Sequence, residues 1–385
     1  MLDCAMAHPA VSVIVPTFNR AHYLDECLQS LLGQSVPAQQ IIVVDDGSED
    51  ETRDVAARFG TRIEYIHKIN GGKPRAVNLA LTKCKGDLVW LFDDDDVALP
   101  DAIAARLNAL STQPDAGFVY SAHHLGTDGT DGTIQQGKLC APALPPNDAF
   151  FFELMRSCFF HLNSALVRRD LYCVVGEFDA TLKAGEDYDM QIRLARVAQP
   201  AYSKAPSFIF RQHGGVRGDK AQQYKAAERS RVFRRYSAAL GRKIRESLSL
   251  GEYLVPRTIQ ELDAMATRRA LLNRAHVMAN HGCIDEMFDD VDAVLRISSA
   301  HDVLAKDTAR EISLAMRTGW AADSATDDWG SFIERVCALR RLPGGAEVAS
   351  ALASGFLILA KSYPGTWTER ANRVRRAAQI ALSKR

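Results

Sequence analysis

Four consecutive aspartates, residues 93–96, follow the apolar run LVWLF of residues 88–92. A short apolar run of this kind is typical of a buried strand, so the carboxylates are expected where ionisation is costly. A divalent cation would offset that cost, because Mg²⁺ and Mn²⁺ prefer hard oxygen ligands and commonly share them with phosphate groups. Two simpler interpretations stay open: a solvated turn, and an N-cap formed by Asp96 and one neighbour for a helix that begins near Pro100.

Three further polar segments also follow predicted strands. They are PTFNR (residues 16–20), DDGSED (residues 45–50) and NGGKPRAVN (residues 70–78). In a parallel sheet, ligands bind at the carboxyl ends of the strands, so we expect these segments and the aspartates along one rim. Together these segments describe a nucleotide-diphosphate site. They offer backbone amides, acids for a base edge or ribose, basic groups for phosphate, and a carboxylate cluster for a metal.

The elements that must position these segments alternate along the first part of the chain. Strands are predicted at residues 11–15, 41–45, 62–67, 88–92 and 117–121. Helices are predicted at residues 24–32, 51–59, 74–84 and 100–110. This repetition predicts an α/β fold of Rossmann-like type, a mainly parallel sheet with helices on both faces. We expect His123 and His124 in a surface loop, and a loop or hairpin over residues 126–137.

A second acidic group, Glu186-Asp187, lies in the segment GEFDATLKAGEDYDMQIRLA of residues 176–195. Acids in a first turn interact favourably with the helix dipole, so the start of a helix is one interpretation. Arg193 is then expected to pair with Asp189 at the i,i+4 spacing. The two adjacent acids also raise each other's pKa, which suits a functional site, and both interpretations can hold together.

Taken in order, these segments resemble glycosyltransferase family two, the inverting enzymes of GT-A fold that use nucleotide-sugar donors. The stretch VSVIVPTFNRAHYLDECLQSLLGQS, followed by IIVVDDGSEDET, is similar to the opening of that family. NGGKPRAVNLAL, LFDDDDVALP and the block of residues 176–195 match its later motifs in order and spacing. The resemblance covers about residues 10–215. It implies a nucleotide-sugar donor, foremost a UDP-sugar, and a glycan or lipid-linked acceptor.

The D-x-D motif of the family falls on Asp93-Asp94-Asp95, although four aspartates leave its register ambiguous by one residue. The resemblance implies that Asp95 is the direct ligand of Mg²⁺ or Mn²⁺. Asp93 and Asp94 are expected near the ribose or the metal-bound water, with Asp93 as a further candidate metal ligand. His213, in FIFRQHGG, is expected to approach the metal or the diphosphate, although a lone histidine is more often structural.

The resemblance also implies how the nucleotide binds. Asp45 or Asp46 should accept a hydrogen bond from the base edge, and the backbone near Pro16 and Thr17 should pass beside the base. Gly47 is expected to supply a turn conformation that a side chain would hinder. An ordinary turn is the simpler interpretation of this segment.

For the chemical step, the resemblance places the base in the Glu186-Asp187 pair. Asp187 is expected to take the proton of the acceptor hydroxyl, with Glu186 orienting the acceptor. The metal would stabilise the departing diphosphate, so no protein acid is needed for the leaving group. Lys73 and Arg75 are expected either to contact the diphosphate or to be solvated residues at a helix start.

Composition narrows the class of protein. The 385 residues hold 47 Lys and Arg against 47 Asp and Glu, which argues against a protein that coats nucleic acid. The eight cysteines are scattered without a zinc-type spacing, which is typical of a reduced, cytoplasmic setting. The first twenty residues lack the basic start of a signal peptide. The longest apolar run without charge, between Glu347 and Lys361, has 13 residues, against the roughly 20 that span a bilayer.

The length predicts two domains, a catalytic domain over residues 1–220 and a helical region over residues 221–385. RALLNRAHVMANHGCIDEMFDDVDAVLRI is expected to form two helices that meet at residues 280–282. Two basic stretches, residues 229–245 and 366–385, suit either peripheral contact with the inner membrane face or a solvated helix face. The second is expected to begin with a Thr366/Glu369 capping box.

Other functions are less consistent with the sequence. A nucleotidyltransferase is expected to have a Gly-rich, basic loop after the first strand, but the segment at that position is PTFNR. A non-catalytic relative that binds sugars or partners would be indicated by degenerate acids, but both acidic motifs are intact. A dinucleotide-dependent oxidoreductase is disfavoured because no G-x-G-x-x-G follows the first strand.

Overall fold

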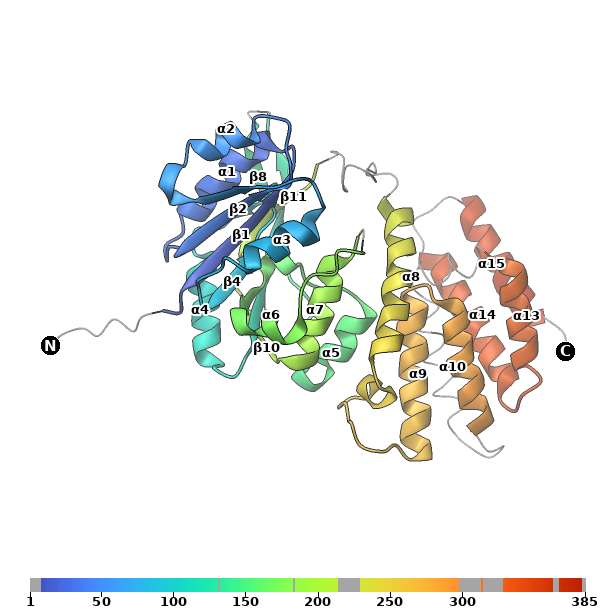
Figure 1. The fold of residues 1–385 in the computed structure, drawn as a ribbon. Helices are drawn as coiled ribbons and strands as arrows, with labels where there is room; N and C mark the ends of the chain where they lie inside the picture. The colour runs from blue at the N-terminus through green and yellow to red at the C-terminus, as the bar shows by residue number, and fades with distance from the viewer. Residues whose placement is uncertain are drawn as a thin grey trace. The chain divides into compact units, whose positions relative to one another are not determined.

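The computed structural model describes residues 8–130, 132–182, 184–213, 229–297, 313, 328–362 and 367–382 (Figure 1). The chain forms two compact units. The first combines Met1–Leu154 with Cys158–Arg229, and the second combines Met155–Ser157 with Ser230–Arg385. Each unit has its own architecture.

A seven-stranded sheet forms the centre of the first unit, with the strand order β10-β6-β9-β4-β1-β2-β3. Its strands are β1 (Val11–Thr17), β2 (Gln40–Asp45), β3 (Glu64–His67), β4 (Leu88–Leu91), β6 (Phe118–Ser121), β9 (Leu166–Arg168) and β10 (Pro200–Ser203). All neighbouring pairs are parallel except those of β9, which runs antiparallel to β4 and β6. The predicted α/β fold with a mainly parallel sheet is confirmed.

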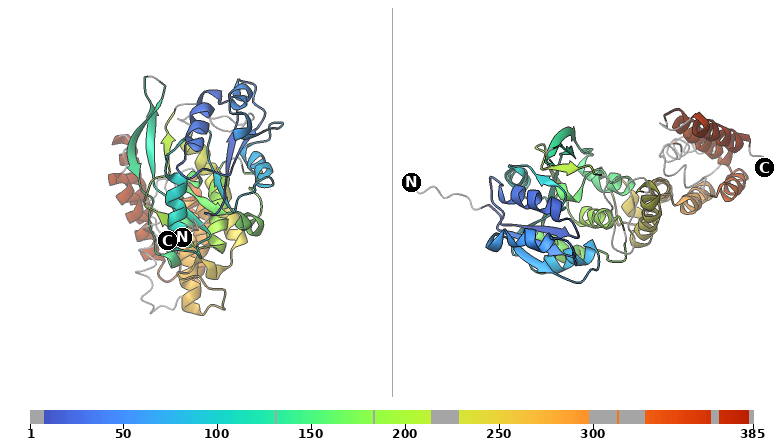
Figure 2. Two further views of the ribbon diagram at one scale, coloured as in Figure 1. Left: turned by 90° about the vertical axis from the view of Figure 1, so that its left-hand side faces the viewer. Right: turned by 90° about the horizontal axis from the view of Figure 1, so that it is seen from above.

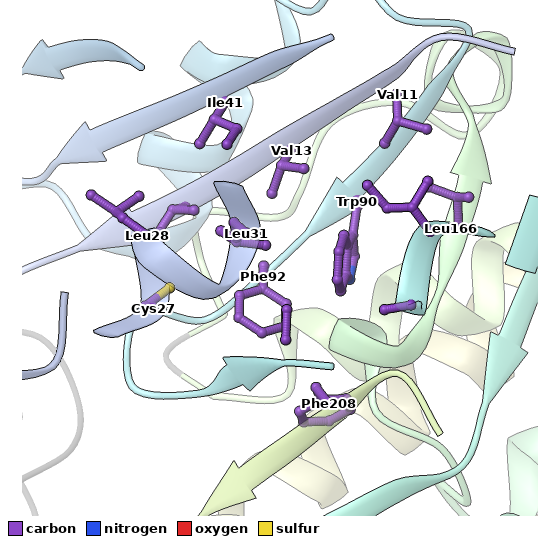
Figure 3. Packing of buried hydrophobic residues seen from close by; sticks show 14 of the residues in the cluster. Val11, Val13, Cys27, Leu28, Leu31, Ile41, Trp90, Phe92, Leu166 and Phe208 are labelled. Carbon is purple, nitrogen blue, oxygen red and sulfur yellow. The ribbon is translucent and has the colours of Figure 1, made fainter. Parts of the chain in front are cut away.

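Helices of the first unit connect the strands. They are α1 (Ala21–Leu32), α2 (Thr52–Ala57), α3 (Lys73–Leu81), α4 (Ala102–Thr112), α5 (Asn147–Arg156), α6 (Arg169–Val175) and α7 (Glu186–Val197). Alternate residues of β1 face opposite sides of the sheet. Val11 and Val13 pack in one cluster with Leu28 of α1 and Trp90 of β4 (Figure 3). Helix α3 packs on β1 and β2, where Ile14 is also fully buried.

A smaller sheet lies beside the first, in the order β5-β11-β7-β8. Its strands are β5 (Val97–Ala98), β11 (Phe208–Arg211), β7 (His123–Asp128) and β8 (Ile134–Cys140). The last two form an antiparallel hairpin that projects from the first unit (Figure 2). The expected hairpin is therefore present, but His123 and His124 belong to β7 and not to a surface loop. Their side chains pack against neighbouring residues in the sheet, including Phe208 and Gln136.

The described part of the second unit is helical. Its α-helices include α8 (Arg229–Ser247), α9 (Ala264–Asn280), α10 (Ile284–Ile297), α13 (Trp329–Leu339), α14 (Gly345–Ser362) and α15 (Trp367–Leu382). The predicted junction between α9 and α10 is confirmed, and Gly282 there has a φ of 77°. Thr366 and the capping box expected from it lie outside the described residues. None of the described helices combines the length and the apolar character needed to cross a membrane.

Candidate active site

The loop after β4 gathers carboxylates at the carboxyl end of the sheet. Oxygen atoms of Asp93, Asp95 and Asp96 all lie within 4.8 Å of one another. Asp94 is also buried, and its Oδ2 has no hydrogen-bond partner among the described residues. The oxygen atoms of Asp93, Asp95 and Asp96 fit a Mg²⁺ or Mn²⁺ ion, because such ions take oxygen ligands and share them with phosphates.

The side chains of Arg20 and His213 already contact this cluster. Arg20 Nη1 lies 2.9 Å from Asp94 Oδ1 and 2.9 Å from Asp95 Oδ2. The attraction of Asp94 and Asp95 raises the pKa of Arg20, although burial acts against its charge. Burial raises the pKa of Asp94 to about 6, although Arg20 acts in the opposite direction. His213 Nε2 lies 2.9 Å from Asp95 Oδ2, so the predicted metal-site histidine does reach the predicted ligand.

Asp96 has a different environment from its neighbours. Its Oδ1 accepts the backbone N–H of Arg211 at 2.9 Å, and its Oδ2 accepts the amide N–H of Asn163 at 2.6 Å. Helix α4 begins at Ala102 with Asp101 at the N-cap position. The interpretation of Asp96 as a helix cap is therefore wrong, because both of its oxygens are engaged elsewhere. Burial, followed by the charges of Asp95 and Asp93, raises its pKa well above the ordinary value.

Lys73 connects the aspartate loop to the second acidic motif. Its Nζ lies 2.7 Å from Asp93 Oδ1 and 3.0 Å from Asp187 Oδ2. Burial disfavours the charge of Lys73, but Asp187, Asp93 and Glu186 outweigh it and raise its pKa well above the ordinary value. Arg75, which follows in the first turn of α3, is exposed, and none of the described ion pairs involves it. Of the two predicted basic residues, Lys73 is the one that lies among the acids.

Helix α7 presents the second acidic motif in its first turn. Gly185 precedes the helix with a left-handed φ of 83°, and Glu186, Asp187 and Asp189 follow in the first turn. Burial and the charge of Asp187 raise the pKa of Glu186 to about 7. Asp187 Oδ1 is buried without a hydrogen-bond partner among the described residues. The predicted i,i+4 pair of Asp189 and Arg193 is confirmed at 2.7 Å, and the predicted start of a helix at Glu186 is present.

The segment after β2 lies beside the end of β1. Thr17 is paired with Asp45 in the parallel ladder, next to the pair of Pro16 and Val44. Asp45 accepts hydrogen bonds from the backbone N–H of Ser48 and the hydroxyl of Tyr65. The structure thus brings three of the predicted base-side residues together, but the Asp45 carboxylate already binds its own loop.

Asp46 organises the loop before α3. Its carboxylate accepts the backbone N–H of Gly71 at 3.0 Å and of Gly72 at 2.6 Å. Lys68 and the Asn70 amide also donate to it. Sequence patterns did not indicate this network, because Lys68 lies outside the motif. Asp46 thereby fixes the loop that leads into Lys73.

The turn between these segments requires glycine. Gly47 has a φ of 85°, and a Cβ built on it would lie 2.9 Å from the backbone nitrogen of Asn70. The predicted role of Gly47 is confirmed, since a side chain would meet backbone atoms that cannot easily move.

Comparison with known structures defines the class of fold. The structure resembles S. aureus TarS 1-349 in complex with UDP-GlcNAc, with a TM-score of 0.52 at 15% sequence identity. The match covers 85% of this chain and 90% of that chain. The chain therefore has the GT-A-like α/β fold, followed by a helical region.

Comparison of sequences shows which family part of the chain resembles. Residues 12–173 match the family model of Glycosyl transferase family 2. An uncharacterized glycosyltransferase of Rickettsia prowazekii is 32% identical over 199 residues, which cover 49% of this chain and 60% of that protein. Chondroitin synthase of Pasteurella multocida is 26% identical over 194 residues, which cover 50% of this chain and 19% of that protein. Residues 12–173 are thus similar to glycosyl transferase family 2, and the chain spans about 60% of the length of that Rickettsia relative.

Proposed function

We propose that the first unit is an inverting glycosyltransferase that moves a sugar from a nucleotide sugar, foremost a UDP-sugar, to a hydroxyl group. The acceptor is a glycan, a lipid-linked molecule or another molecule with a free hydroxyl group. The observation that carries this proposal is the position of Lys73, which contacts Asp93 of the D-x-D motif and Asp187 of the second acidic motif. The ammonium group of Lys73 thus contacts both a carboxylate proposed for the donor site and the carboxylate proposed as the general base.

Asp95 and Asp93 would hold the metal, with His213 approaching through its contact with Asp95. A bound Mg²⁺ or Mn²⁺ would neutralise the diphosphate as it leaves. Asp94 would face the ribose. Lys73 would attract the diphosphate by charge, and Arg75, which is exposed, would contribute through a weaker contact.

The remaining roles follow from the rim of the sheet. Pro16 and Thr17 would flank the base, and Asp45 or Asp46 would accept from its edge. Asp46 would also help to position Lys73, because its carboxylate binds the backbone of Gly71 and Gly72 in the loop before α3. These contacts orient the donor so that its anomeric carbon faces the second acidic motif.

Asp187 would act as the general base. Inversion requires the acceptor hydroxyl to attack from the face opposite the nucleotide, and a carboxylate within hydrogen-bond reach removes its proton. One oxygen of Asp187 is held by Lys73, while Oδ1 has no described partner and can accept that proton. Glu186, beside it at the start of α7, would orient the acceptor.

We further propose that the protein acts in the cytoplasm, at the inner membrane face where lipid-linked acceptors lie. The basic helices α8 and α15 support this placement, because Lys and Arg side chains are attracted to anionic lipids. Binding to vesicles of anionic and of neutral lipid, at low and high salt, would test it.

Donor turnover tests the proposal. Release of nucleoside diphosphate is measured for a panel of UDP-, GDP- and dTDP-sugars with Mn²⁺, and donor affinity is measured in parallel. Asp187→Asn should keep the affinity and lower turnover by about 10²–10⁴-fold, the usual contribution of a general base. Asp170→Asn, at an exposed acid in the first turn of α6, is the matched control and should keep both. Turnover that persists in Asp187→Asn would contradict the assignment of the base.

A further inference from the structure

A side-chain amide lies between the aspartate loop and the core of the first unit. Asn163 Oδ1 accepts the backbone N–H of Asp93 at 3.2 Å, and its Nδ2 donates to Asp96 Oδ2 at 2.6 Å. The two partners fix the orientation of the amide, because a backbone N–H only donates and a carboxylate only accepts. Asn163 is only 4% exposed. The amide therefore holds both ends of the four-residue acidic run.

The backbone that carries this amide is itself held from the core. Trp90 Nε1 donates to the carbonyl oxygen of Asn163 at 2.6 Å. Arg106 Nη1 donates to the next carbonyl, that of Ser164, at 3.4 Å, and its guanidinium stacks on the Trp90 ring at 3.8 Å. Trp90 and Arg106 are fully buried. Asn163 is thus fixed before any ligand binds, as preorganised sites require.

The hydrogen bond from Asn163 gives Asp96 a structural role. Its second oxygen accepts the backbone N–H of Arg211, and Asp96 is only 1% exposed. Asp93 and Asp95 share the oxygen cluster with it, but their side chains are the more exposed ones. The engagement of Asp96 on both oxygens leaves these two acids to face a ligand.

We propose that Asn163 is a positioning residue for the cation-binding acids, with Asp96 as its structural partner and not a ligand. The inference rests on the proposed function and deepens it. It assigns the register of the motif to residues 93–95. Removing a partner that orients metal ligands typically lowers metal affinity by about 10–100-fold.

An exchange of the two side chains tests the pairing. Asn163→Asp places a second carboxylate against Asp96 and should weaken Mn²⁺ binding by about tenfold or more. In the double variant Asn163→Asp with Asp96→Asn, the amide at position 96 donates to the carboxylate at position 163 and still accepts from Arg211. The double variant should regain Mn²⁺ affinity to within about threefold of the native protein, since the bond between the two positions is restored with its direction reversed.

Mn²⁺ binding is measured on the full chain by the loss of the free-ion EPR signal in the presence of UDP, and folding by circular dichroism. Asn273→Ala is the control, because Asn273 is a buried amide of the second unit that donates to the Tyr253 carbonyl at 2.7 Å. It should lower the melting temperature and leave Mn²⁺ affinity unchanged.

Three results would overturn the inference. The first is native Mn²⁺ affinity in a folded Asn163→Asp variant, which leaves the proposed function intact. The second is a double variant as weak as the single one, or one that stays unfolded when the single one is unfolded. The third is a native protein that binds no Mn²⁺ with UDP present, which would overturn the metal-assisted function as well.

Discussion

Lys73 holds its ammonium nitrogen 3.0 Å from Asp187 Oδ2, although 114 residues separate the two in sequence. The first lies at the start of α3 and the second in the first turn of α7. The same nitrogen contacts Asp93, so one cation joins the donor side of the site to the acid proposed as the base.

Replacement of Lys73 and replacement of Arg75, the two basic residues of α3, should affect donor binding differently. Lys73→Met removes the ammonium group from between Asp93 and Asp187, and a hydrogen bond to a charged group contributes about 1.5–3 kcal/mol. The donor KM should therefore rise about tenfold or more. Arg75→Met, at an exposed position, should change it by less than about threefold. Steady-state kinetics with varied donor checks this, and a larger effect of Arg75→Met would reverse the assignment.

A methyl group at Gly47 should disturb the site as well as the fold. Gly47→Ala meets the backbone nitrogen of Asn70 at 2.9 Å, in the loop that Asp46 holds. Gly60→Ala is the matched control, because Gly60 also has a positive φ of 56° but has nothing within 4 Å. Both variants bear the roughly 1–2 kcal/mol cost of a left-handed residue with a side chain. Only Gly47→Ala should lose further stability, measured by urea unfolding, and donor affinity, measured by calorimetry. Equal effects of the two variants would contradict the close approach of residue 47 to the Asn70 backbone.

His123 should make the first unit sensitive to acid. Burial, and then the neighbouring His161 and His124, lower the pKa of His123 to about 4, from 6.5. As pH falls below 6.5 the unfolded chain takes up a proton that the folded chain does not, so the free energy of unfolding decreases towards pH 4. His123→Phe should retain the stacking on Phe208 and reduce the loss of stability between pH 7 and pH 5. Urea unfolding at the two pH values measures the difference, and an unchanged loss would exclude His123 as its source.

The second unit contains a buried carboxylate between two arginines. Asp290 is 1% exposed and pairs with Arg245 and Arg274. Asp290→Ala leaves both guanidinium groups without this partner and should cost about 3–5 kcal/mol of unfolding free energy. Asp292→Ala, which breaks the i,i+4 pair with the exposed Arg296, should change the unfolding free energy far less, because surface ion pairs contribute little to stability. Denaturant unfolding compares the two, and similar costs would show that the buried pairs contribute little.

Much of the fold could be predicted, because many elements of both units follow from local sequence patterns. The apolar run of residues 88–92 predicted a strand, and β4 covers Leu88–Leu91. The turn at residues 280–282 predicted the end of one helix and the start of the next, as α9 and α10 show. The second sheet was harder to foresee. β5 has only two residues, and its partner β11 lies about a hundred positions away.

The composition of the site was only partly predictable. Motifs indicated the acids and Lys73, since each follows a strand or begins a helix. Arg20 and Asn163 reach the aspartate loop across 74 and 70 residues of sequence, and no periodicity encodes such contacts. The role of Asp96 stayed open for the same reason, because its partners come from distant segments.

Binding of UDP with and without Mn²⁺, measured by titration calorimetry on the native protein and on Asp95→Ala, tests the central claim most directly. We predict that Mn²⁺ tightens UDP binding to the native protein and that Asp95→Ala abolishes this gain. Asp54→Ala, at an exposed acid of α2, should keep the gain. No UDP binding by the folded native protein in the presence of Mn²⁺, or an undiminished gain in Asp95→Ala, would contradict the metal-assisted function.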